Sequence, residues 1–239
     1  MNSALADRFY LVAPDLRGHG ASDKPDAPSA YDTSTPWAND IQAIIDHYGL
    51  TKTVLVGWSM GGKILLDYLR IHGDSALAGV AHVGSSVTSG KFTNPEAAKL
   101  RASPAVAAKG MYGDDLGENL AATMAFLTAC TAKPLPRDEF AMMVGYNMLC
   151  PPHIRVPSRK RNEDYRADAQ ECRVPALIIW GDQELVMPRV LFDESCANFA
   201  DPEPVVFPDC GHATFWEAPE KFNQTLADFA DRAFERCAA

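Results

Sequence analysis

Short apolar runs alternate with segments of helical periodicity along most of this chain. The runs that have the length and composition of buried strands cover residues 9–13, 53–57, 77–83, 176–180 and 205–207. Most of them are followed by a segment whose apolar residues recur at helical spacing. Because parallel strands need crossover helices, the pattern predicts an α/β fold with a mostly parallel sheet that helices cover on both faces.

The predicted helices have recognisable ends. The first is predicted to begin at Thr35-Pro36, which offer an N-cap and a proline in the first turn, and to end at Gly49. A second helix is predicted over residues 60–72, and the last helix begins at Pro219. One stripe of this last helix is apolar, so we expect it to pack against the core.

The alternation stops in the middle of the chain. Between residues 87 and 168 the signals are helical, with helix starts predicted at Asn94-Pro95 and Pro136-Arg137. We therefore divide the chain into a first core part at 1–86, a helical cap insertion at 87–168 and a second core part at 169–239. Long insertions in compact folds commonly carry function.

Composition excludes several classes of function. The net charge of −9 argues against binding to nucleic acid, and no apolar run is long enough to span a membrane. The N-terminus lacks the order of a signal peptide, so we expect a cytoplasmic protein. The six cysteines and six histidines show no metal-binding spacing, so no metal and no cofactor is predicted.

One hexapeptide, Gly57-Trp-Ser-Met-Gly-Gly62, joins a predicted strand to a predicted helix. A Gly-x-Ser-x-Gly motif in this context forces a sharp turn that exposes the serine. We expect glycine at positions 57 and 61 to remove steric clashes in that turn. Ser59 would then lie at a helix N-terminus, where the backbone N–H of Met60 can stabilise a developing oxyanion.

A serine nucleophile needs a base and an acid that orients it. His212 follows the predicted strand 205–207, at the edge of the sheet where open α/β folds place their sites, whereas His82 lies inside a strand. Asp182 and Glu184 both follow the strand at 176–180, and either could orient His212. The chain order is thus serine, acid, histidine.

Four segments together resemble the α/β-hydrolase fold family: residues 15–25, the hexapeptide at 57–62, residues 180–184 and residues 211–213. The resemblance covers essentially the whole chain and is closest to the small esterases and cofactor-free haloperoxidases. It implies that Ser59 is the nucleophile, that residues 87–168 form the cap over the substrate pocket, and that the acid stands three residues after Gly181. Glu184 occupies that position, where the family usually has aspartate, so Glu184 is preferred and Asp182 is the rival.

A second departure concerns the N-terminal region. Members of the family carry further strands and a His-Gly loop that donates one oxyanion N–H, and this chain begins later than that loop. We therefore expect either a truncated gene model or fragment, or a degenerate paralogue, with the N–H of Met60 as the only identifiable oxyanion donor. A short sheet with an open edge would favour pairing between copies.

The residues and the resemblance together predict a serine hydrolase that cleaves a small, largely apolar ester or related acyl compound. The substrate is a small molecule, and Trp58 either lines its pocket or packs against the sheet. One alternative is a non-catalytic or vestigial ligand-binding member of the fold. Perhydrolase or haloperoxidase-type activity and carbon–carbon bond hydrolysis use the same triad and are further alternatives.

Overall fold

The computed structural model describes residues 5–101 and 109–238. Four parallel strands form one sheet in the order β1-β2-β3-β4. Their bounds are Thr53–Trp58 (β1), Leu77–Val83 (β2), Ala176–Gly181 (β3) and Pro202–Phe207 (β4). The order of the strands in the sheet is the same as their order in the sequence. Each crossover therefore connects two strands that are neighbours in the sheet.

Helices cover both faces of this sheet, as the sequence predicts. On one face lie α2 (Met60–His72), α7 (Arg166–Glu171) and α8 (Arg189–Asn198), and α1 (Ser34–Tyr48) packs against α2. On the other face α10 (Pro219–Ala238) places Phe222 and Phe229 against the strands. The fully buried strands β2 and β3 therefore carry apolar side chains on both faces.

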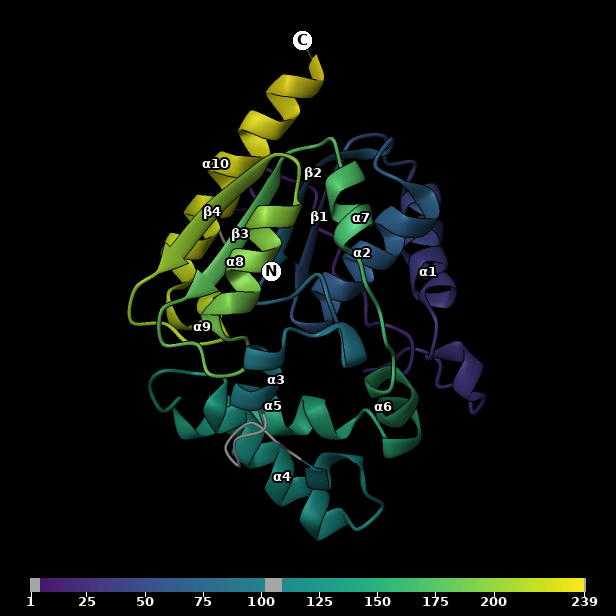
Figure 1. Ribbon diagram of the computed structural model, residues 1–239, viewed down its shortest axis with the longest axis vertical. Coiled ribbons are helices and arrows are strands. Elements are labelled where there is room, and N and C mark those ends of the chain that lie inside the picture. Colours follow the sequence, from purple (N-terminus) through teal and green to yellow (C-terminus); the bar gives the residue numbers. More distant parts are fainter. Residues whose placement is uncertain (1–4, 102–108, 239) are drawn as a thin grey trace.

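Helices alone make up the regular elements described between β2 and β3. They are η2 (Gly90–Phe92), α3 (Pro95–Arg101), η3 (Lys109–Tyr112), α4 (Leu116–Ala129), α5 (Arg137–Met148), α6 (Pro152–Arg159) and α7. Helices α3 to α6 lie together beyond the carboxyl ends of the strands (Figure 1). We call α3 to α6 and their connections the cap. The bridge between Thr88 and Asp164 brings the two ends of the insertion together.

A buried ionic cluster fastens the end of the cap to the core. Arg161, just after α6, forms a bidentate ion pair with Asp67 of α2, at 2.9 Å and 2.5 Å. The hydroxyl of Tyr165 donates to the same carboxylate at 2.6 Å. The Asp67 side chain is fully buried and that of Arg161 is 7% exposed, so this ion pair is largely removed from solvent.

The prediction of a strand at 9–13 is wrong. This segment is not a strand, and Tyr10 is 73% exposed. The aromatic rings of the segment pack on helices instead, Phe9 against Phe234 and Tyr10 against Tyr48. A strand persists only when a neighbour completes its hydrogen-bond ladder, and among the described residues β1 pairs with β2 alone.

The helix starts agree closely with the sequence analysis, with one exception. Helix α1 begins at Ser34 with Thr33 as its N-cap, two residues before the predicted cap at Thr35. Its C-terminus at Gly49 is confirmed, because Gly49 adopts the left-handed conformation with φ 61°. A short helical turn, η1 (Pro28–Ala30), precedes α1, and α9 (Thr214–Glu217) precedes α10.

No helix in the described part of the chain is both long and apolar enough to cross a membrane.

Candidate active site

Ser59 occupies the sharp turn between β1 and α2. Its backbone angles are φ 52° and ψ −114°, a conformation that L-residues rarely adopt. A Cβ on Gly57 would lie 2.4 Å from the carbonyl oxygen of Gly61, so the turn needs glycine at 57. Position 61 behaves differently from our expectation, because a Cβ there would meet nothing within 4 Å. The steric requirement for glycine therefore falls on the strand side of the serine.

Two hydrogen bonds hold this strained turn against the end of β2. The backbone N–H of Ser59 donates to the carbonyl of Val83 at 2.9 Å. The Ser85 hydroxyl donates to the carbonyl of Ser59 at 2.7 Å. Strained backbone persists where its surroundings over-determine it, and it clusters at functional sites. The neighbouring strand thus fixes the position of the serine.

His212 lies in the loop between β4 and α9, and its imidazole meets Glu184. The Nδ1 atom of His212 lies 2.6 Å from Oε2 of Glu184. The other carboxylate oxygen, Oε1, accepts the backbone N–H of Val186 at 2.7 Å. Both side chains are buried, at 1% and 0% exposure, and the carboxylate is held on both oxygens. This pairing leaves Nε2 as the ring nitrogen that can act on a substrate.

The rival acid, Asp182, points elsewhere. It is exposed, and its carboxylate accepts a hydrogen bond from the side chain of Gln183 at 3.2 Å. The structure therefore brings Glu184, and not Asp182, to the imidazole. Cys210, two residues before His212, is buried, and burial raises the pKa of its thiol, which disfavours a nucleophilic thiolate.

Gly84 lies against the histidine ring, next to the residue that accepts the Ser59 N–H. It follows Val83 directly, and a Cβ on Gly84 would lie 3.0 Å from Nδ1 of His212. The Nε2 atom of His212 is buried and has no hydrogen-bond partner among the described residues. A buried polar atom without a partner is costly, so an unpaired basic nitrogen beside a serine turn indicates a chemical role.

Met60 and Trp58 flank Ser59 and have different environments. Met60 is the first residue of α2, where backbone N–H groups have no partner within the helix. The indole N–H of Trp58 donates to the carbonyl of His212 at 2.8 Å, and its ring packs on Phe215 with centroids 5.0 Å apart. Trp58 thus braces the histidine loop, while contact between Trp58 and a substrate stays a prediction.

The sequence analysis missed three residues that shape the site. Gly84 and Ser85 follow directly after β2, a position at the sheet edge that could have indicated them. Glu217 lies five residues after His212, and its carboxylate accepts the backbone N–H of Gly211 at 2.7 Å. Glu217 belongs to the segment Gly-His-Ala-Thr-Phe-Trp-Glu-Ala-Pro at 211–219, which resembles the small esterases and haloperoxidases, but the spacing alone assigns its carboxylate no role.

A second buried imidazole, His82, lies one residue before the carboxyl end of β2. Neither ring nitrogen has a hydrogen-bond partner in the described part of the chain. Burial, with a smaller contribution from the charge of Lys63, lowers the pKa of His82 to about 3. Its ring packs against Phe199 with centroids 5.5 Å apart, so His82 behaves as a neutral core residue.

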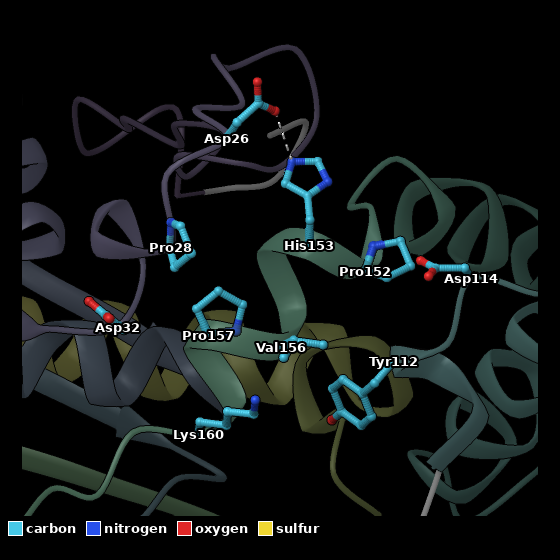
Figure 2. A pocket seen from close by; sticks show the side chains of 10 residues that line it. All are labelled: Asp26, Pro28, Asp32, Tyr112, Asp114, Pro152, His153, Val156, Pro157 and Lys160. Atoms are coloured by element: carbon cyan, nitrogen blue, oxygen red, sulfur yellow. Dashed lines mark ion pairs between the residues drawn. The ribbon is translucent and has the colours of Figure 1, made fainter.

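An open surface pocket of about 510 Å³ lies between the N-terminal region and the cap (Figure 2). Its lining includes Asp26, Asp32, Tyr112, His153 and Lys160, and none of the predicted site residues. Asp26 and His153 lie next to each other in this lining, with Oδ1 and Nε2 3.8 Å apart (Figure 2). This pocket is therefore separate from the buried pair of Glu184 and His212.

Comparison with known proteins identifies the family of the chain. The 2-hydroxy-6-oxononadienedioate/2-hydroxy-6-oxononatrienedioate hydrolase of Pseudomonas sp is 27% identical over 82% of this chain and 69% of its own length. The AB hydrolase superfamily protein YisY of Bacillus subtilis is 26% identical over 97% of this chain and 85% of its own. A crystal structure of a putative aryl esterase from Burkholderia cenocepacia superimposes with a TM-score of 0.80 and 29% identity, covering 92% of this chain and 79% of that one. The profile of the alpha/beta hydrolase fold matches residues 1–219, and the chain belongs to this family of hydrolases.

Proposed function

We propose that this protein is a serine hydrolase that cleaves small, largely apolar esters through an acyl-enzyme on Ser59. The observation that carries the proposal is the buried contact of 2.6 Å between His212 and Glu184, beside a serine in a strained turn. An isolated histidine or serine has many structural explanations. A buried carboxylate–imidazole pair near a half-buried strand-to-helix serine has the arrangement expected of a catalytic triad.

Each residue has a distinct role in the proposed reaction. His212 accepts the proton of the Ser59 hydroxyl at Nε2 while the serine oxygen bonds to the ester carbonyl carbon. Glu184 stabilises the imidazolium that forms and holds its tautomer. The N–H of Met60 donates to the oxyanion. His212 then protonates the departing alcohol, and water, activated by the same imidazole, releases the acid and regenerates Ser59.

The substrate class rests on charge and on resemblance. A net charge of −9 disfavours anionic substrates, which the protein would repel. The Burkholderia protein, which is 29% identical to this chain, is described as a putative aryl esterase. Aryl and short-chain acyl esters are therefore the first compounds to test.

Covalent labelling tests the nucleophile directly. A fluorophosphonate probe should label the wild-type protein and not Ser59→Ala, because the probe traps an activated serine. Release of p-nitrophenol from p-nitrophenyl acetate should follow the same pattern. Equal labelling of both proteins would contradict the proposal. Labelling of Ser59 without ester turnover would instead favour perhydrolysis or carbon–carbon bond hydrolysis by the same residues.

The two acidic candidates give a matched pair of variants. Glu184→Gln should lower kcat by about 10³–10⁴, since the imidazole loses the partner that fixes its tautomer. Asp182→Asn makes the same chemical change on an exposed side chain two residues away, so its kcat should stay within about twofold of wild type. The reverse result would assign the acid to Asp182.

A further inference from the structure

The carboxylate of Glu217 joins two loops that are far apart in the sequence. Its Oε2 atom accepts the backbone N–H of Gly211, directly before His212, at 2.7 Å. Its Oε1 atom accepts the N–H of Ala132 at 2.7 Å and that of Lys133 at 3.3 Å. Ala132 and Lys133 follow α4, so they belong to the cap. One side chain thus bonds the histidine loop and the cap together.

Further contacts run along the same junction. The N–H of Ala213 donates to the carbonyl of Cys130, the residue that ends α4, at 3.0 Å. A Cβ on Gly211 would lie 2.9 Å from the backbone nitrogen of Ala132, so these two segments of the chain lie in direct contact. The indole N–H of Trp216 donates to Glu139 of α5 at 2.6 Å. The cap is therefore attached to the segments on both sides of His212.

We propose that Glu217 is a positioning residue that couples the position of the cap to the position of His212. The inference rests on the proposed role of His212 as general base. A cap displaced by a substrate would move the Glu217 carboxylate and, with it, the backbone at Gly211. Because a misplacement of about 1 Å can cost about 10²-fold in rate, this bridge sets how well His212 meets Ser59.

Glutamine at this position separates the bridge from simple packing. A carboxylate accepts hydrogen bonds on both oxygens, whereas an amide offers one oxygen and one NH2 group. In Glu217→Gln the backbone N–H of one loop still meets an oxygen acceptor. The backbone N–H of the other loop meets the side-chain NH2 group, which is also a donor, so that hydrogen bond is lost. Glu217→Asp keeps the charge but is one methylene shorter, so it reaches only one loop. Glu220→Gln is the matched control, since Glu220 is exposed and three residues away.

Amide hydrogen exchange tests the bridge without any substrate. In Glu217→Gln and Glu217→Asp we expect exchange to accelerate about tenfold at Gly211, or at Ala132 and Lys133, with Glu220→Gln unchanged. Unchanged exchange at all three amides would overturn the proposal. The exchange measurement does not depend on the proposed function. If Ser59 of the wild-type protein were not labelled, the proposed hydrolase activity would be rejected, and the exchange rates would still decide whether the Glu217 bridge exists.

The kinetic arm tests the coupling. We expect kcat for p-nitrophenyl acetate to fall about 10–100-fold in Glu217→Gln, with KM and the Tm changed far less, because the substrate site stays formed while the base is displaced. Glu220→Gln should match wild type. A kcat within twofold of wild type in the folded Glu217→Gln protein would overturn the proposed coupling. The coupling would also be overturned if kcat fell only in proportion to the fraction of the variant that is unfolded.

Discussion

Acid should destabilise this protein through His82, and replacing that residue should remove the effect. His82 is 1% exposed, and its pKa is lowered from 6.5 to about 3, chiefly by burial. Between these two pH values the unfolded chain binds a proton at this position and the folded chain does not. The stability that the neutral ring provides is therefore complete above about pH 6.5 and is lost as the pH falls toward 3.

The magnitude follows from the difference between the two pKa values. Each pH unit in the window costs about 1.4 kcal/mol of the free energy of unfolding. The loss due to His82 is then about 2 kcal/mol at pH 5 and about 4 kcal/mol at pH 3. The free energy of unfolding of a typical domain is only about 5–15 kcal/mol, so the loss due to this one imidazole is a large fraction of the stability.

Urea denaturation at several pH values measures this loss. We expect the free energy of unfolding of wild type to fall about 1.4 kcal/mol per pH unit more steeply than that of His82→Leu between about pH 6 and pH 4. His47→Leu is the control, since His47 is exposed and its substitution should leave the wild-type slope unchanged. Parallel slopes for wild type and His82→Leu would refute the reasoning, because His82 would then be protonated or hydrated inside the folded protein.

Three further variants test other parts of the structure. Gly57→Ala should fail to label with fluorophosphonate and should lose about 1–3 kcal/mol of stability, because its Cβ would lie 2.4 Å from the Gly61 carbonyl; normal labelling would argue against a tight turn. Asp67→Asn should lower the free energy of unfolding by about 3 kcal/mol, since it removes the nearer carboxylate charge from the buried Arg161 guanidinium and leaves only the ion pair of 3.3 Å with Glu163, and a change below 1 kcal/mol in urea titrations would be inconsistent with burial. Trp58→Phe should lower kcat about tenfold with little change in KM, because it removes the hydrogen bond to the His212 carbonyl, and a rise in KM alone would assign Trp58 to the substrate pocket.

Local sequence determined the elements and the order of the candidate catalytic residues. Helical spacing and end signals placed α2 and α10 at their observed starts, because periodicity and caps act within a few residues. The Gly-x-Ser-x-Gly turn required a strand before it and a helix after it, and the structure has both. Ser59, Glu184 and His212 could thus be named as candidates without coordinates.

Residue spacing left both Asp182 and Glu184 open, and the family resemblance favoured Glu184, but only the tertiary structure shows which carboxylate meets the imidazole. Both follow β3 in the sequence, and only the placement of the loop after β4 brings one of them to within 2.6 Å of His212. The same holds for Glu217, whose two partners lie in loops that meet only in the folded chain. Hydrogen bonds of this kind depend on differences of about an ångström between distant segments, which residue spacing does not encode.

The segment at 9–13 is a case in which the local sequence predicted an element that the tertiary structure does not form. Its apolar composition satisfies the local rule for a buried strand, yet it packs its rings on α1 and α10. A helix completes its hydrogen bonds within itself, so local sequence can specify it, whereas a strand exists only beside a partner. For this protein the sequence therefore determined the helices and the chemistry of the candidates, and the tertiary structure decided which runs became strands and which side chains met.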